Sequence, residues 1–387
     1  MRITMLLQDF MGGVYYNALN LAASLHTEGH ESSFILIEQK DQPADARITD
    51  LTAFPHRTLS FSAADNKHYI FRKLAAMIPD DCEVLLLNGY LDFRLVTHRT
   101  LRQKVIGIVH GDYPYYYELA TLSESRIDFF VGVSAVITAK LIDLLPHRIN
   151  DIAFIPPMVL DMRRPRSENT GQGLRIIFVG RLTPEKGFNL LPLIDEELRQ
   201  RGIACTWTVI APHTTDRFDD WLHQPAVRYH DRMANKDMAA IYSQQDILLL
   251  PSHAEGSPLC VLEAMQCGVV PVTTDLPTLS GMINDGDTGF LFGIDDITAI
   301  TAILTKLSTA PALLRQAGAR AESHAASLYS EPILRKKWTN LLNRKQSGKD
   351  FARPVVSIYD RMDLPWLPNL VTRGIRKLKT RDKGKSN

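Results

Sequence analysis

Short apolar runs of strand length alternate with longer segments of helical periodicity along most of this chain of 387 residues. One such series fills residues 1–160 and a second fills residues 174–330. Strands that alternate with helices favour parallel sheets covered by helices on both faces. A chain of this length can bury two cores of ordinary size. The sequence therefore predicts an α/β protein with two doubly wound, Rossmann-like domains that face a cleft.

The boundary between the two series is marked by composition. Residues 161–173 (DMRRPRSENTGQG) are polar, contain Pro and Gly, and lack periodicity, as is typical of a linker. We therefore expect an N-terminal domain over residues 1–160 and a second domain over residues 174–330.

The densest cluster of local signals lies in residues 247–274. An apolar run at 247–250 predicts a strand, and a second strand is expected at 269–274. Between them, Ser257 suits a helix N-cap, Pro258 suits the first helical position, and Gly268 suits the left-handed position after the last turn. The pattern predicts one strand-helix-strand unit.

The start of this helix has the chemistry of an anion site. Unpaired N–H groups and positive partial charge gather at a helix N-terminus and suit a phosphate. The residues of this predicted cradle are Gly256, Ser257, Pro258 and Leu259. The flanking carboxylates of Glu255 and Glu263 would repel a phosphate but would accept hydrogen bonds from hydroxyls, as in dinucleotide folds. Phosphate and polyol together indicate a nucleotide sugar. The alternative is that Glu255 is a solvated loop residue and Glu263 an exposed helix residue.

A second charged motif follows the first strand of the second domain. In GRLTPEKG, Arg181 and Lys186 flank Pro184 at the mouth of a helix. Two fixed cations there would stabilise a departing diphosphate as its bond to the sugar breaks. The alternative is an ordinary pair of solvated charges on a loop.

The first domain offers three weaker candidates. Gly12 and Gly13 follow the first strand and permit close backbone approach by a ligand, although they also suit a plain tight turn. His110 ends the strand 104–109, at the sheet edge where α/β ligand sites form, but a lone histidine can be structural. The aromatic run 113–117 (YPYYY) fits either an acceptor wall or ordinary packing.

These motifs together resemble the retaining GT-B glycosyltransferases of family 4, the glycosyl transferases group 1. The resemblance rests on Glu255 and Glu263 in an E-x7-E arrangement, on Gly180, Arg181, Glu185, Lys186 and Gly187 in the glycine-bounded basic loop, and on Gly12 and Gly13. The chain departs from the family pattern at Pro277-Thr278 and Gly281, where relatives often have Gly-Gly and then Glu.

The resemblance implies a role for each matching residue. Glu255 would face the sugar hydroxyls and Glu263 the ribose, while Arg181 and Lys186, with the backbone at Gly180, would hold the diphosphate. The Gly12-Gly13 loop would face the cleft, and His110 would contact the transferred sugar or the acceptor. Residues 331–346 would form a helix that crosses back to the N-terminal domain. In the implied mechanism the acceptor attacks from the face that the diphosphate leaves, and a phosphate oxygen takes the proton.

Composition restricts the partners. The formal charge of +1 gives no general attraction for nucleic acid. Four scattered cysteines, no signal-peptide pattern and no apolar run of membrane-spanning length favour the cytoplasm. Asp285-Gly286-Asp287 has a D-x-D pattern, but its Asn, Asp and Gly neighbours favour a turn, so we expect no metal and no cofactor.

The tail, residues 347–387, carries seven basic residues and one acidic residue between Arg373 and Lys385. An apolar face formed by Leu367, Leu370, Val371, Ile375 and Leu378 beside Trp366 would suit a helix on an anionic membrane surface. Such a helix would place the protein at the inner face of the membrane. A disordered basic tail is the alternative.

The expected function is sugar transfer from a nucleotide diphosphate sugar to an acceptor hydroxyl of a cell-surface glycan or glycolipid. Two rivals remain on the same architecture: a nucleotide-sugar epimerase or phosphorylase, and a binding protein without catalysis.

Overall fold

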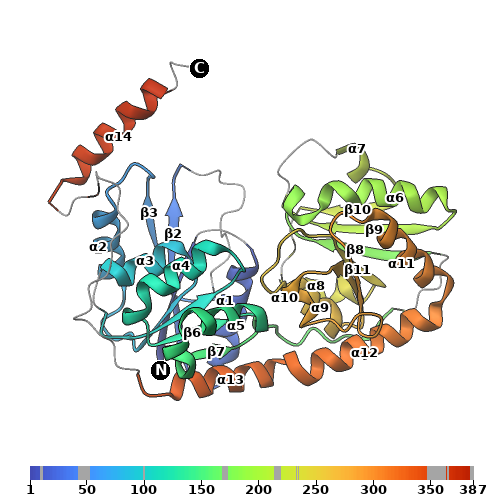
Figure 1. Cartoon of the computed structure of the whole chain (residues 1–387), viewed down its shortest axis with the longest axis horizontal. Coiled ribbons are helices and arrows are strands. Elements are labelled where there is room, and N and C mark those ends of the chain that lie inside the picture. The colour runs from blue at the N-terminus through green and yellow to red at the C-terminus, as the bar shows by residue number, and fades with distance from the viewer. Residues whose placement is uncertain are drawn as a thin grey trace. The chain divides into compact units, whose positions relative to one another are not determined.

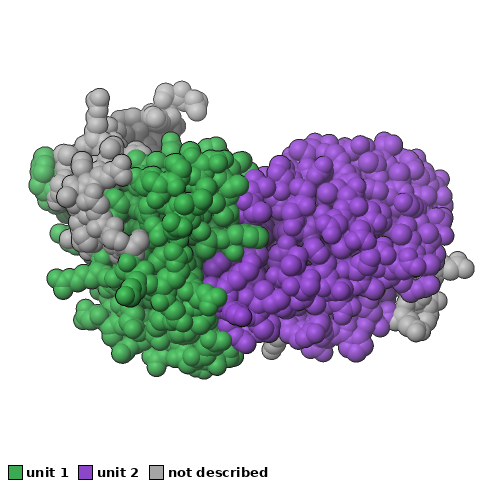
Figure 2. Space-filling view, turned by 60° about the horizontal axis from the view of Figure 1, so that its bottom comes forward, with its two compact units in different colours: residues 1–132, 138–154, 339–387 green, residues 133–137, 155–338 purple. Residues whose placement is uncertain are grey.

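The computed structural model describes residues 1–8, 12–41, 53–98, 101–167, 173–212, 219–231, 233, 235–346, 363 and 366–383. The chain divides into two compact units, coloured separately in Figure 2. Unit 1 contains residues 1–132, 138–154 and 339–387, and unit 2 contains residues 133–137 and 155–338. The division at residue 155 precedes the expected linker, of which residues 168–172 lie outside the described part of the chain.

Unit 1 is built on a seven-stranded sheet with the order β3-β2-β1-β4-β5-β6-β7, and its strand pairs are parallel. Its elements are β1 (Arg2–Gln8), α1 (Gly13–His26), β2 (Glu31–Gln39), β3 (His56–Phe61), α2 (Lys67–Met77), β4 (Val84–Leu87), α3 (Tyr90–His98), β5 (Lys104–Val109), α4 (Pro114–Ser123), η2 (Glu124–Arg126), β6 (Phe129–Gly132), α5 (Ala135–Leu144), η3 (Pro146–Asp151) and β7 (Ile152–Phe154). Every residue of β4 is buried, as expected of a central parallel strand covered on both faces.

Unit 2 repeats the plan with six parallel strands in the order β10-β9-β8-β11-β12-β13. Its elements are β8 (Leu174–Val179), η4 (Pro184–Lys186), η5 (Phe188–Leu190), α6 (Leu191–Gln200), β9 (Cys205–Ile210), α7 (Asp219–Leu222), β10 (Val227–His230), α8 (Asn235–Tyr242), β11 (Ile247–Leu250), α9 (Leu259–Gln266), β12 (Val270–Thr274), α10 (Pro277–Ser280), β13 (Phe290–Phe292), α11 (Ile297–Thr309) and α12 (Pro311–Tyr329). Figure 1 shows α6 and α11 on one face of the sheet and α8, α9 and α12 on the other.

The two sheets share one strand order, in which the direction of winding reverses between β1 and β4 in unit 1 and between β8 and β11 in unit 2. In open parallel sheets, ligands bind outside the carboxyl ends of the strands at such a reversal. The predicted α/β class with two doubly wound parallel sheets is confirmed, and each unit has one position of this kind.

Two predicted helix starts were wrong. Ser257 is not an N-cap: α9 begins at Leu259 after an extended Pro258, and the Ser257 hydroxyl instead lies 3.6 Å from the Met282 sulfur. The helix expected directly after GRLTPEKG begins as a single 3₁₀ turn, and α6 starts only at Leu191, since Pro192 fits the first turn of an α-helix and not its interior. Gly268 has φ +68°, the predicted left-handed conformation.

The last two described helices follow unit 2 in the sequence. Helix α13 (Glu331–Asn343) contains the division between the units, after Trp338, and α14 (Asn369–Lys383) belongs to unit 1. Among the described residues no single helix has the length and apolar composition of a membrane span. The run from α11 through α13 meets that standard only as a pair bent by 105°.

Candidate functional site

The two predicted donor motifs meet at the winding reversal of unit 2. The basic loop, residues 180–187, leaves the end of β8, and residues 251–258 leave the end of the adjacent strand β11. The amide of His253 donates to the carbonyl of Glu185 at 2.8 Å and joins the two loops. Gly187 has φ +66°, and a Cβ there would overlap the carbonyl of Pro251. Glycine is therefore required for the loops to approach this closely.

Lys186 and Glu255 form an ion pair across this junction. Lys186 Nζ lies 2.8 Å from Glu255 Oε1 and 3.4 Å from the carbonyl of Ala254. The two side chains are only 17% and 8% exposed. The Thr278 hydroxyl donates to the Glu255 carbonyl at 2.9 Å and fixes the same loop from α10. The alternative of Glu255 as a solvated loop residue is therefore wrong.

Arg181 has a different environment. Its guanidinium lies 3.5 Å from the carboxylate of Glu185, and both side chains are more than 40% exposed. An exposed pair of this length contributes little to stability. The basic loop thus holds one cation in a fixed, half-enclosed position and leaves a second beside it in contact with solvent.

Glu263 lies inside the unit and not on an exposed helix face. It is 6% exposed on α9, and the hydroxyl of Tyr242 donates to its Oε2 at 3.0 Å. Desolvation raises the pKa of Glu263 to about 7, despite this hydrogen bond. The alternative of Glu263 as an exposed residue is wrong.

Both carboxylates of the E-x7-E motif act on the thiol of Cys260, which lies between them in the sequence. Desolvation first, and then the charges of Glu255 and Glu263, raise the pKa of the Cys260 thiol, while Lys186 lowers it. The cradle residues between the carboxylates differ in exposure: Gly256, Ser257 and Pro258 are partly exposed, and Leu259 is buried. Unit 2 therefore brings a cation, two carboxylates and a helix start into one place.

The remaining candidates, Gly12, Gly13 and His110, belong to unit 1. Gly12 is extended before α1, and Gly13 begins the helix with open space where a Cβ would stand. A pocket of about 320 Å³ opens at the winding reversal between β1 and β4. It is lined by Leu7, Gln8, Val14, Tyr15, Asn88, Gly89, Tyr90, Tyr115 and Tyr116. None of these lining side chains is charged.

His110 contacts Asn88, which lines this pocket. Its Nε2 lies 2.9 Å from Asn88 Oδ1, and Asn88 Nδ2 donates to the carbonyl of Leu6 at 3.0 Å. Because the Leu6 carbonyl fixes the orientation of the amide, Nε2 carries the hydrogen and Nδ1 is left as an acceptor. Desolvation lowers the pKa of His110 to about 3, so the imidazole is neutral at pH 7.

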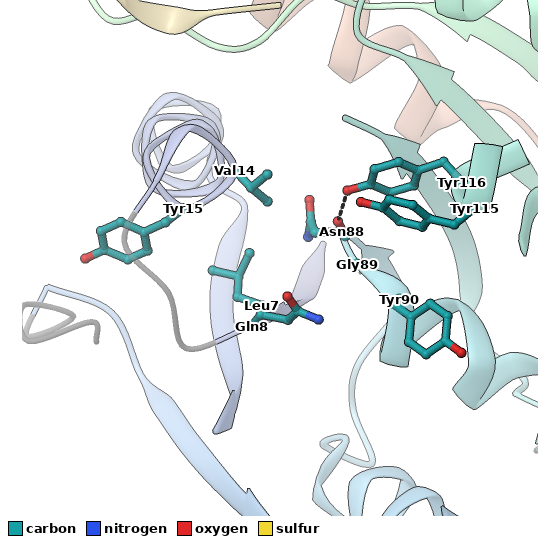
Figure 3. A pocket seen from close by; sticks show the side chains of 9 residues that line it. All are labelled: Leu7, Gln8, Val14, Tyr15, Asn88, Gly89, Tyr90, Tyr115 and Tyr116. Atoms are coloured by element: carbon teal, nitrogen blue, oxygen red, sulfur yellow. Dashed lines mark hydrogen bonds between the residues drawn. The ribbon is translucent and has the colours of Figure 1, made fainter. Parts of the chain in front are cut away.

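The tyrosines of the aromatic run 113–117 differ in what they contact: some line the pocket, and one makes a contact elsewhere. Tyr115 and Tyr116 line the pocket with stacked rings, 4.5 Å between centroids, and Figure 3 shows both extending toward Asn88 and Gly89. The Tyr117 hydroxyl instead donates to Asp112 at 2.6 Å. The run begins α4, with Pro114 in the first helical turn.

The D-x-D segment forms a turn. Asp285 accepts the Leu291 amide at 2.9 Å, and Asp287 pairs with Arg320 at 2.6 Å. Gly286 between them has φ +73°. Within the described residues there is no cluster of three or more His, Cys, Asp or Glu arranged to hold a metal.

Sequence reasoning missed three residues of these sites: Tyr242, Thr278 and Asn88. Each acts by a contact to a residue at least 21 positions away in the chain. A usable signal existed only for Asn88, which directly follows an unbroken apolar strand and precedes Gly89.

Comparisons with known proteins agree with this geometry. Residues 162–324 match the model of a family described as glycosyl transferases group 1. An uncharacterised 41.2 kDa protein of the cps region of Klebsiella pneumoniae is 28% identical over 132 residues, 34% of this chain and 36% of that protein. A D-inositol 3-phosphate glycosyltransferase of Gordonia bronchialis is 30% identical over 164 residues, 39% of this chain and 36% of that protein. The matches thus span little more than a third of these relatives.

The fold likeness extends further than the sequence likeness. The crystal structure of Anabaena HepE in complex with UDP-glucose superposes with a TM-score of 0.71 over 88% of this chain and 99% of that one, at 14% identity. The fold of this chain is therefore the GT-B fold of glycosyltransferases, and its second unit carries the region shared with the glycosyl transferases group 1.

Proposed function

We propose that this protein is a retaining glycosyltransferase of family 4, which moves a sugar from a nucleotide diphosphate sugar to an acceptor hydroxyl. The observation that carries the proposal is the junction of the β8 and β11 loops, where Lys186 and Glu255 pair 2.8 Å apart. A cation beside a carboxylate suits a ligand with an anionic part, which the cation would bind, and a hydroxylated part, which would donate hydrogen bonds to the carboxylate. The match of residues 162–324 to glycosyl transferases group 1 supports the same class.

The donor is assigned to unit 2. Lys186 and the exposed Arg181 would neutralise the diphosphate, together with the backbone at Gly180, the loop amides of Gly256 and Ser257, and the amide of Leu259 at the start of α9. No metal is needed in this arrangement. Glu255 would accept hydrogen bonds from the transferred sugar. Its contact with Lys186 would keep that cation in position before the donor arrives, so little reorganisation is needed at the moment of reaction.

Glu263 is assigned to the nucleoside end of the donor. A carboxylate on α9 that is held by Tyr242 suits the two hydroxyls of a ribose. Because the pKa of Glu263 is raised to about 7, a fraction of its carboxyl groups is protonated at neutral pH. A ribose donates hydrogen bonds to the carboxylate, so donor binding would favour the deprotonated form.

The acceptor is assigned to the pocket of unit 1. Its uncharged lining, with the stacked Tyr115 and Tyr116, suits the face of a neutral sugar ring. The relative in a Klebsiella cps region supports an acceptor among cell-surface glycans or glycolipid intermediates. The four cysteines are free thiols, which supports a cytoplasmic location.

In the proposed mechanism the acceptor hydroxyl attacks the anomeric carbon from the face that the diphosphate leaves. The C–O bond to the diphosphate breaks, the new glycosidic C–O bond forms, and a diphosphate oxygen takes the acceptor's proton. The anomeric configuration is retained without a protein base. A neutral His110 fits this scheme, since its Nδ1 would accept a hydrogen bond from a hydroxyl of the sugar or acceptor while its Nε2–H stays with Asn88.

The proposal is tested with a panel of UDP-, GDP- and ADP-sugars. One donor is expected to raise the melting temperature, since a ligand at a hundred times its dissociation constant adds about 2.7 kcal/mol. With that donor and a membrane extract as acceptor source, labelled sugar should enter a glycan with release of nucleoside diphosphate. Epimerised donor without acceptor, phosphate-dependent turnover, or binding without any turnover would each replace the proposal with one of its rivals.

A further inference from the structure

The first turn of α14 is attached to unit 1 by polar contacts. Asn66, the N-cap of α2, donates through Nδ2 to the Leu367 carbonyl at 3.1 Å and to the Thr372 hydroxyl at 3.3 Å. The backbone amide of Asn66 donates to Asn369 Oδ1 at 2.7 Å, and Asn369 Nδ2 donates to Asp65 at 3.0 Å. Figure 1 shows the first turn of α14 near α2 at the edge of the unit.

A charged contact continues the attachment one turn later. Arg376 donates to the carbonyl of Asp65 at 2.8 Å and pairs with the carboxylate of Asp363 at 3.1 Å. Asp363 also accepts the amide of Lys67 at 2.8 Å, and its side chain is only 2% exposed. Removing one partner from such an enclosed pair is costly, so the contact defines which face of α14 lies against the unit.

The face that lies against unit 1 is the polar one. Thr372 is completely buried, whereas Leu370 is 82% exposed, Val371 is 44% exposed and Trp366, just before the helix, is 73% exposed. Residues two apart on an α-helix point about 200° apart, which explains why Leu370 and Thr372 have opposite environments. A helix of a soluble protein normally buries its apolar stripe and exposes its polar one. In α14 this arrangement is reversed.

The charge of the helix identifies the surface that would cover the apolar face. The sequence of α14 contains six basic residues and one acidic residue. Two copies of so positive a helix would repel one another face to face, whereas an anionic lipid surface attracts both the charges and the apolar side chains. Trp366 suits the boundary between headgroups and hydrocarbon.

We propose that α14 docks unit 1 on an anionic lipid bilayer through Trp366, Leu370 and Val371, with its polar face held by Asn66, Asp65 and Asp363. The inference does not depend on the proposed sugar transfer. Docking of unit 1 would bring its aromatic pocket to the bilayer surface, where an acceptor carried by a lipid would lie.

The test is co-sedimentation of the full chain with phosphatidylcholine vesicles, with and without 30% phosphatidylglycerol, after clearing aggregates without vesicles. The wild type should bind the anionic vesicles, and raising the salt should weaken the binding. Leu370→Glu should lower the partition coefficient at least tenfold. The matched control, Leu193→Glu, changes a leucine of unit 2 that is 54% exposed and should have no effect.

A second variant tests the charge contribution and leaves Trp366, Leu370 and Val371 unchanged. Lys377→Gln combined with Lys379→Gln should lower the partition coefficient roughly fivefold for each charge removed. Unchanged melting temperatures would show that both variants fold. The proposal is overturned if Leu370→Glu binds like the wild type, or if neutral and anionic vesicles bind equally. It is also overturned if Leu370→Glu abolishes a dimer seen by sedimentation velocity while the wild type ignores vesicles.

Discussion

Lys186 Nζ and Glu255 Oε1 lie 2.8 Å apart, and they come from loops that leave two adjacent strands of one parallel sheet. Each residue thereby orients the other at the winding reversal of unit 2. The pair explains why a cation expected at the diphosphate and a carboxylate expected at the sugar occur in one small region. It also means that the donor would have to share Lys186 with Glu255.

Removing the Lys186 cation should reduce the transfer rate more than it reduces stability. We expect Lys186→Ala to lower kcat about 10²–10³-fold, because it removes charge stabilisation of the departing diphosphate. Steady-state kinetics with the preferred donor measure the effect. The matched control is Arg320→Ala, which breaks an exposed ion pair with Asp287 in the same unit and should leave kcat unchanged. Equal loss in both variants would remove the assigned role.

Donor affinity should depend on pH through Glu263. Its pKa is raised to about 7 in the folded chain, so below pH 7 the carboxyl is protonated and must lose its proton to accept ribose hydroxyls. We therefore expect the dissociation constant of an intact nucleotide sugar to rise about tenfold between pH 8 and pH 6. Isothermal titration at several pH values measures this.

The control for the pH experiment is Glu263→Gln, which cannot titrate. Its donor affinity should be lower than that of the wild type at pH 8 and flat across the range. The same raised pKa predicts that the free energy of unfolding changes with pH in the direction opposite to donor affinity. Between the unfolded pKa near 4.5 and pH 7 the folded state holds the extra proton, so this group's contribution to stability falls as pH rises. A pH-independent dissociation constant in the wild type would contradict the assignment of Glu263 to the ribose.

His110→Ala should impair transfer without impairing donor binding. The neutral imidazole is held through Asn88, so its loss removes a hydrogen bond that is already oriented. We expect kcat to fall about 10²-fold while the dissociation constant of the nucleotide sugar is unchanged. His147→Ala, which changes an exposed histidine of unit 1, is the control. A wild-type rate for His110→Ala would leave the histidine with a purely structural role.

Gly187 should be far less tolerant of substitution than a glycine with the same backbone conformation and free space. Gly187 and Gly202 have φ of +66° and +70°, but only Gly187 faces a carbonyl, that of Pro251. Gly202→Ala should cost about 1 kcal/mol, from the left-handed conformation alone. Gly187→Ala should cost about 3 kcal/mol or more, because a steric overlap is added. Urea unfolding compares the two, and equal costs would mean that the loops do not meet closely.

The sequence predicted most reliably the elements that are buried on both sides. The strands predicted at 104–109 and 247–250 have the same bounds as β5 and β11, because a central parallel strand is an unbroken apolar run. Strand β3 was missed, since only Leu59 and Phe61 of its six residues are buried and no pattern results.

The candidate site was predictable only in part. Lys186, Glu255 and Glu263 could be selected because local motifs carry them, but the ion pair of the first two depends on which strands are neighbours. The contact between Tyr242 and Glu263 is of the same kind, since it joins α8 to α9. Ser257 was assigned wrongly because the cap preference is local, whereas the extended conformation of Pro258 moves the helix start to Leu259.

The most direct test of the central claim is a crystal structure of the chain soaked with the nucleotide sugar that stabilises it most. We expect the diphosphate beside Lys186 and the amides of Gly256 and Ser257, with the sugar against Glu255 and the ribose against Glu263. A diphosphate bound elsewhere, with the Lys186–Glu255 pair undisturbed and no donor atom near either residue, would contradict it.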